Sequence, residues 1–152
     1  MDDPALREEP ARSASGVERM SDEDCVELLS ETTTVGRVAF QSSTGVQLLP
    51  VNFVFRQGRV YFTTSLDSTL AELAAGRDDV AFEIDYPDRM TQHGWSVLVK
   101  GTTREVAAAD VDLSPRGPRS WAPGARELLV ELTPDQITGR RIRHEPQPTS
   151  QP

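Results

Sequence analysis

The sequence is poor in the residues that build metal sites and disulfides, and it has no long apolar run. A single cysteine, Cys25, excludes an intrachain disulfide and a metal site made from a cysteine cluster. The two histidines, His93 and His144, have no carboxylate or cysteine at ligand spacing, which argues against a histidine metal ligand or general base. No apolar stretch approaches the roughly 20 residues that span a bilayer, so we expect no membrane partner.

Positive charge is scarce as well. The chain has 16 Lys and Arg residues against 24 Asp and Glu residues, which gives a net charge of −8 and a pI near 4.7. Because a nucleic-acid-binding face neutralises phosphates with basic side chains, this balance argues against a nucleic-acid partner. The acidic N-terminus (Asp2, Asp3, Glu8, Glu9) lacks the basic segment and apolar core of a secretory signal. We therefore expect a cytoplasmic protein.

The length of 152 residues fits one domain with one hydrophobic core. Residues 1–19 and 144–152 are polar, contain proline and have no apolar periodicity. We predict disordered tails over 1–19 and 144–152 and a folded domain over 20–143.

A short helix is predicted at the start of this domain. Ser21 is followed three residues later by Asp24, as in a capping box, and Cys25, Val26 and Leu29 then form an apolar stripe. With no histidine nearby in the sequence, Cys25 fits a small buried hydrophobe better than a nucleophile.

The rest of the domain has the patterns of short strands. The first three are joined by tight turns at 42–45 and 57–58, and because parallel strands need a long crossover, they form an antiparallel meander. A second short helix is predicted within 65–76. The predicted strands cover 35–40, 46–55, 60–64, 80–86, 95–106 and 128–132, followed by a short closing segment at 137–142.

Six short strands with little helix predict a mainly β fold, either a closed or partly closed barrel or a sandwich, and the pattern favours the barrel. In the strand 95–106, Trp95, Val97 and Val99 fall on one face. Pro50, inside the second strand, marks an edge, a bulge or a place where a group other than a neighbouring strand meets the backbone.

Four stretches carry a resemblance to a known family: VGRVAF (35–40), LLPVNF (48–53), VYFTT (60–64, running to Ser68) and GWSVLVKG (94–101). In this order and spacing they resemble the FMN-binding split barrels of the pyridoxamine 5′-phosphate oxidase-like family. The first resembles the opening strand, the second the strand along the isoalloxazine ring, the third the phosphate-binding strand and helix start, and the fourth a later strand that approaches the ring.

The resemblance implies a six-stranded antiparallel split β-barrel with a few short helices, and a homodimer with flavin mononucleotide (FMN) at the subunit interface. It implies cofactor contacts for Leu49, Pro50, Val51 and Asn52 at the ring, for Thr63, Thr64, Ser68 and Thr69 at the ribityl phosphate, and for Trp95 and Ser96 on the other side of the ring. The residue after the serine is usually Lys or Arg in the family, and here it is Thr69. Arg37, Arg59 or Arg77 is left as another source of charge for the phosphate.

The resemblance implies an FMN-dependent oxidoreductase acting on a small molecule. The segment 139–142 and Trp121 resemble only loosely the C-terminal substrate-binding segment of the pyridoxamine phosphate oxidases. Vitamin B6 oxidation is therefore not expected. In such an enzyme the flavin carries the redox chemistry and no side chain has to act as acid or base. This agrees with a sequence that has no glycine-rich phosphate loop, serine-nucleophile motif or metal-ligand cluster.

Several alternatives stay open. A reductase of the same fold would use a deazaflavin as a diffusible cosubstrate, and a non-catalytic protein would hold flavin, haem or nothing. The site residues also have structural interpretations: Thr63 and Thr64 suit any strand, Asn52 suits a strand edge, and Trp95 suits a core.

Overall fold

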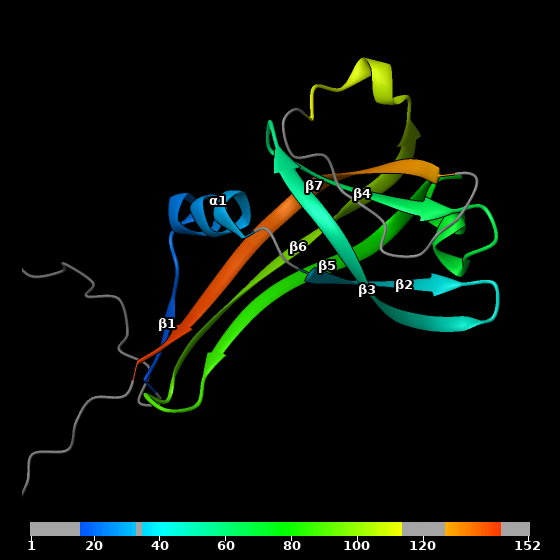
Figure 1. The fold of residues 1–152 in the computed structure, drawn as a ribbon. Helices are drawn as coiled ribbons and strands as arrows, with labels where there is room; N and C mark the ends of the chain where they lie inside the picture. The colour runs from blue at the N-terminus through cyan, green and yellow to red at the C-terminus, as the bar shows by residue number, and fades with distance from the viewer. Residues whose placement is uncertain (1–15, 33–34, 114–126, 144–152) are drawn as a thin grey trace, which may run out of the picture.

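The structure, a computed structural model, describes residues 16–32, 35–113 and 127–143. Within them it contains seven strands, one α-helix and two short 3₁₀ helices (Figure 1). In chain order these are β1 (Val17–Arg19), α1 (Asp22–Glu31), β2 (Val35–Ser42), β3 (Gly45–Arg56), β4 (Arg59–Ser65), η1 (Thr69–Leu73), β5 (Arg77–Asp88), β6 (His93–Val106), η2 (Ala108–Asp110) and β7 (Glu127–Ile142). No helix in the described part of the chain is long and apolar enough to cross a membrane.

Helix α1 begins where the capping pattern predicts. The Ser21 hydroxyl accepts a hydrogen bond from the backbone N–H of Asp24 at 3.1 Å. Cys25 and Leu29, one helical turn apart, are fully buried, as predicted. The prediction that Val26 shares this stripe is wrong, since Val26 is 40% exposed. A residue next to a buried one is rotated away from the core by about 100°.

The first three strands of the barrel form the predicted antiparallel meander. The turn between β3 and β4 consists of Gln57 and Gly58, whose φ angles are 49° and 75°. Positive φ at both central residues is the requirement of a type I′ turn, whose twist matches that of the strands it joins. The second predicted helix is reduced to the 3₁₀ turn η1, at one end of the barrel (Figure 1).

The sheet closes into a ring. Six strands follow one another in the order β7-β4-β3-β2-β5-β6, and β6 pairs again with β7. Every pairing in it is antiparallel. The predicted six-stranded antiparallel split barrel is therefore confirmed, and the sandwich alternative is excluded.

Two predicted boundaries are corrected. The sixth strand and the closing segment are one continuous strand, β7, although Pro134 interrupts its sequence. The ladder between β6 and β7 shifts register next to Gly101, and a Cβ on Gly101 would lie 3.0 Å from the Cα of Pro134. A bulge opposite a glycine thus admits the proline.

The second correction concerns the N-terminal tail predicted over 1–19. Its last residues, Val17–Arg19, form β1, which pairs with residues 140–142 of β7. Residues 1–15 and the C-terminal tail 144–152 lie outside the described part of the chain.

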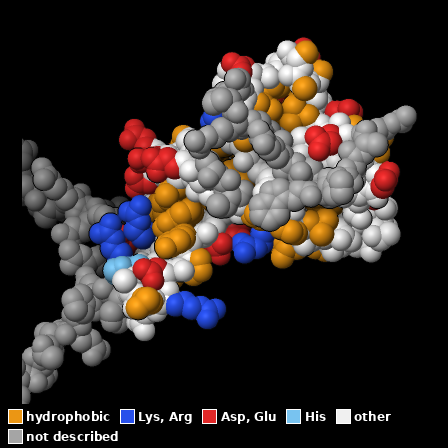
Figure 2. Space-filling view, viewed as in Figure 1, with side chains coloured by type: hydrophobic (Ala, Val, Ile, Leu, Met, Phe, Trp, Pro, Cys, Tyr) orange, Lys and Arg blue, Asp and Glu red, His pale blue; other side chains and the backbone are white. Residues whose placement is uncertain are grey.

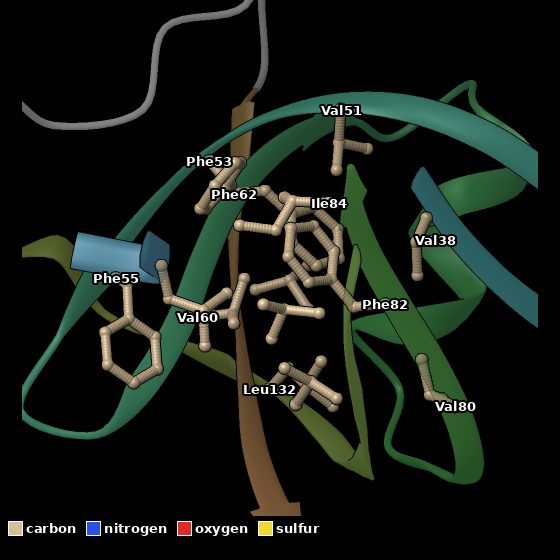
Figure 3. Close-up of a cluster of buried hydrophobic side chains, with 14 of the residues drawn as sticks. Val38, Val51, Phe53, Phe55, Val60, Phe62, Val80, Phe82, Ile84 and Leu132 are labelled. Carbon is tan, nitrogen blue, oxygen red and sulfur yellow. The ribbon is translucent and has the colours of Figure 1, made fainter. Parts of the chain in front are cut away.

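The core fills the interior of the barrel with aliphatic and aromatic side chains (Figure 3). Phe53 of β3 and Phe82 of β5 meet edge to face, with ring centroids 4.8 Å apart. Val97 and Val99 of β6, which fall on one face of the strand, are fully buried in the core. Trp95, on the same face, is half-buried and packs against the edge of the core.

The ends of β5, β6 and β7 extend beyond the barrel and carry β1 (Figure 1). We call this extension the arm and define it as residues 17–19, 85–96 and 140–143. It lies at the opposite end of the molecule from η1 (Figure 1). The barrel therefore has two ends with different residues available for binding.

Candidate functional site

The ladder between β3 and β4 is short, and beyond its end the two strands do not pair with each other in the described residues. It stops at the pair Phe53–Phe62, and no further pair joins these two strands in the described residues. Beyond this point β3 continues its ladder with β2, and β4 continues its ladder with β7. Over residues 49–52 of β3 and 63–65 of β4, one edge of each strand therefore has no strand neighbour in the described residues, and we call this region the split.

The four predicted site residues of β3 line one side of the split. Val51 is 6% exposed and Leu49 packs against the core, so both point into the barrel. Pro50 is exposed and Asn52 is half-buried, on the alternate positions of the strand. Pro50 thus lies in a segment with a strand neighbour on one edge only, one of the alternatives that the sequence left open.

The predicted residues of β4 and η1 line the other side. Thr64 is buried and Thr63 is half-buried on the alternate face. The chain then turns back, and the Ser68 hydroxyl caps η1 by accepting a hydrogen bond from the N–H of Leu70 at 3.1 Å. Thr69 is exposed at the start of η1. Eight of the ten predicted site residues therefore gather around the split.

Hydrogen bonds fix η1 to the hairpin turn between β2 and β3, and an ion pair fixes it to the start of β5. The Glu72 carboxylate accepts hydrogen bonds from the hydroxyl and the backbone N–H of Ser43, and Arg77 contacts it at 2.9 Å. The hydrogen bonds from Ser43, with the charge of Arg77, lower the pKa of Glu72 below its ordinary value. The sequence analysis missed Glu72, because its partner lies 29 residues away in the chain.

Each of the three arginines considered for the phosphate has a carboxylate partner. Arg77 is held by Glu72, as described above. Arg37 contacts Asp85 at 3.0 Å, and this hydrogen bond raises the pKa of the guanidinium. Arg59 lies 3.8 Å from Glu131, at the opposite end of β4 from Thr64.

The remaining two predicted residues, Trp95 and Ser96, lie in the arm. In the register of β7, Thr64 faces Leu128 while Trp95 faces Arg141. These positions are separated by roughly 40 Å along the strand at about 3.3 Å per residue. Within one copy, Trp95 and Ser96 therefore lie far from the β4 side of the split. On the β3 side, Pro50 faces Arg37, which contacts Asp85, and Asp85 faces Ser96.

Trp95 and Ser96 also face different sides of β6, as adjacent strand residues do. Ser96 opens onto a shallow hollow of about 460 Å³ on the outer face of the barrel. The hollow is lined by small and apolar side chains, including Ala39, Leu48, Ala81 and Leu98, and by the charged side chains of Arg37, Glu83 and Arg140. Leu48 is 64% exposed, so this hollow, which we call the outer hollow, presents apolar surface to solvent.

A buried carboxylate on β7 was also missed by the sequence analysis. Glu131 is 3% exposed, accepts a hydrogen bond from the Tyr61 hydroxyl at 2.9 Å and pairs with Arg104 at 2.9 Å. Burial favours the neutral acid, but the bonds from Arg104 and Tyr61 outweigh it, so the pKa of Glu131 is lowered. Glu131 of β7 thus connects to Tyr61 of β4 and to Arg104 of β6, which is a structural role.

The chemistry available at the split is binding rather than acid–base catalysis. It offers strand edges and the hydroxyls of Thr63, Thr64 and Ser68, next to the core residues Leu49 and Val51. Among the described residues, no group of three or more His, Cys, Asp or Glu side chains is arranged to hold a metal ion. Such a site suits a planar ligand with polar edges.

The chain is similar to known proteins over most of its length. The family model of pyridoxamine 5′-phosphate oxidase matches residues 21–141. An uncharacterized protein of Mycobacterium tuberculosis is 30% identical over 144 residues, which cover 91% of this chain and 94% of that one.

Solved structures share the fold. An FAD-binding protein from Mycobacterium smegmatis is 31% identical, with a TM-score of 0.68 over 83% of this chain and 100% of that one. An FAD-binding protein from Mesorhizobium loti is 18% identical, with a TM-score of 0.70 over 84% of this chain and 98% of that one, which supports the fold alone. By its family match and its fold, the chain belongs to the pyridoxamine 5′-phosphate oxidase family.

Proposed function

We propose that this protein binds a flavin at the split and acts as an FMN-dependent oxidoreductase on a small molecule. The observation that carries the proposal is the end of the β3–β4 ladder at Phe53–Phe62. It leaves one edge of each strand without a strand neighbour in the described residues, next to hydroxyl side chains. The polar edge of an isoalloxazine ring needs hydrogen-bond partners of this kind.

Each predicted residue has a role in this proposal. The backbone of 49–52 lines the polar edge of the ring, next to the core residues Leu49 and Val51. Thr63, Thr64 and Ser68 donate hydroxyl hydrogen bonds toward the ribityl phosphate. When bound, FMN supplies hydride or electron transfer, and the residues around it bind it, orient it and exclude water.

A second copy of the chain completes the proposed site. Trp95 and Ser96 lie far along β7 from Thr63 and Thr64, the residues assigned to the phosphate, so in this proposal they act in the partner's site. The outer hollow, with Leu48 and Leu98, gives the two copies an apolar surface to bury. The proposal is therefore a homodimer with each flavin held between the copies.

FAD is a second candidate for the flavin. Thr69 brings no charge to the phosphate, and Arg37, Arg59 and Arg77 are engaged by carboxylates. A monophosphate held without a cation loses a charge-assisted contact, whereas the adenosine of FAD would add contact area. The similar M. smegmatis protein, which binds FAD, favours this candidate.

The absorption spectrum of the purified protein, before and after adding FMN or FAD, tests the proposal. A flavin band that stays with the protein through gel filtration supports it, and the flavin extracted from the protein decides between FMN and FAD. A colourless protein that retains neither flavin overturns it. Turnover with a deazaflavin, or the lack of any turnover, would then assign the protein to one of the two alternatives.

A further inference from the structure

One face of the arm carries a row of side chains, of which the proposed flavin site uses only Trp95. Tyr86 of β5 faces Trp95 of β6, and Trp95 faces Arg141 of β7, so the three lie side by side on one face. Next to this row, Asp88 faces His93, and all five line a pocket of about 390 Å³ with Arg143. We call it the arm pocket.

The aromatic pair in the arm pocket is open to a ligand. The rings of Tyr86 and Trp95 are stacked, with centroids 6.4 Å apart and planes inclined by 22°. Trp95 is half-buried against the core, but Tyr86 is 60% exposed. A core-filling aromatic residue would be covered, so the exposed ring face of Tyr86 is available for stacking with a planar ligand.

The charge of the arm pocket is positive although the chain is acidic overall. Its lining holds two arginines against one aspartate, a net charge of +1 with His93 neutral. Glu18 of β1, outside the lining, lies 3.8 Å from Arg143 and faces Arg141 in the ladder between β1 and β7. Arg141 forms no ion pair with a carboxylate in the described ranges. Figure 2 shows Lys and Arg side chains at this end of the molecule, with acidic side chains among them.

Asp88, the acidic residue of the lining, already accepts hydrogen bonds from its own hairpin. The carboxylate of Asp88 accepts hydrogen bonds from the Thr91 hydroxyl and from the backbone N–H groups of Met90 and Thr91. These bonds lower its pKa, so it stays ionised and keeps the hairpin in shape. The guanidinium of Arg141 remains as the group that binds a ligand.

We infer that the arm pocket binds a planar aromatic monocarboxylate, with its ring on Tyr86 and Trp95 and its carboxylate on Arg141. The volume fits one small ring compound, since small-molecule sites begin at about 300 Å³. A guanidinium pairs with a carboxylate through two parallel hydrogen bonds. The inference rests on the proposed function in one respect: this carboxylate would be the second reactant beside the flavin.

Titration of the flavin-free protein with benzoate and with benzamide tests the inference without involving the flavin. Calorimetry is combined with Trp95 emission, read in a Trp121→Phe background because the chain has two tryptophans. We expect benzoate to bind and to quench Trp95, and we expect Arg141→Gln to weaken benzoate by about tenfold to a hundredfold, as expected for a charge-assisted contact. Benzamide binding should not respond to Arg141→Gln.

Arg89→Gln is the matched control, because it removes one positive charge from the same hairpin outside the arm pocket. No benzoate binding, equal affinity for both ligands, or an equal loss in Arg89→Gln would overturn the inference. A protein that binds no flavin would contradict the proposed function, but it would not affect the benzoate binding measured on the flavin-free protein.

Discussion

Gly139 of β7 lies directly against Cys25 of α1. A Cβ at position 139 would be 2.5 Å from the Cys25 sulfur and 3.2 Å from the Cβ of Met20. Such distances leave no room for a methyl group. Because Gly139 has no side chain, α1 packs directly on the sheet at the point where the barrel ends and the arm begins.

Gly139→Ala should destabilise the protein by about 1–3 kcal/mol, because overpacking forces the helix away from the sheet. The measurement is the free energy of unfolding in urea. Cys25→Ala in the same chain should recover part of the loss by removing the sulfur. If Gly139→Ala is neutral, α1 does not pack as described.

Glu131→Gln should cost about 1–3 kcal/mol at neutral pH, because it weakens the bonds to Tyr61 and Arg104. The pKa of Glu131 is lowered in the folded state, so its contribution is present at neutral pH. It is lost as the pH falls below the unfolded value of about 4.3, through the folded pKa.

The difference in unfolding free energy between the wild type and Glu131→Gln should therefore shrink on acidification from pH 7 to pH 3. Glu105→Gln, at an exposed carboxylate nearby, is the control and should show a small, flat difference. A Glu131→Gln difference that stays constant with pH would contradict the ionised, buried carboxylate.

Thr69→Lys should tighten FMN by about tenfold to a hundredfold if the ribityl phosphate lies beside η1 without a cation. Riboflavin, which has no phosphate, should bind the two proteins equally. Thr69→Gln is the neutral control of similar length. An unchanged FMN affinity in Thr69→Lys would show that the ribityl phosphate does not lie beside η1.

Leu48→Glu should convert the dimer that we propose into a monomer, because it places a charge in the outer hollow that we assign to the interface between copies. Light scattering at micromolar concentration gives the mass. Val26→Glu, at a similarly exposed apolar residue of α1, should leave the mass unchanged. A wild type with the mass of one chain would refute the interface.

The local elements could be predicted because their signals are local. Ser21 with Asp24 marks the start of α1, and Gln57-Gly58 marks a two-residue turn. The continuity of β7 could not be predicted, since Pro134 reads as a break unless its register with Gly101 is known. Strand β1 is three residues long and has no pattern of its own.

The candidate site was predictable only in part. The order of the stretches around Pro50 and Ser68 allowed the family resemblance, and the structure places both beside the split. The separation of Trp95 from the β4 side of the split depends on the register of β6 and β7, which periodicity does not determine. The same holds for Glu131, whose partners come from two other strands.

The central claim is that each flavin lies between two copies, and a mixed dimer tests it most directly. Ser68→Asp keeps the cap of η1 but repels the phosphate, and Trp95→Ala removes the residue contributed by the partner. Each variant alone should bind little flavin. Co-expressed with different affinity tags and purified as the mixed dimer, the pair should have one intact site and bind about one flavin per dimer, half the wild-type value. A mixed dimer that binds no more flavin than either variant alone would contradict a site shared between copies.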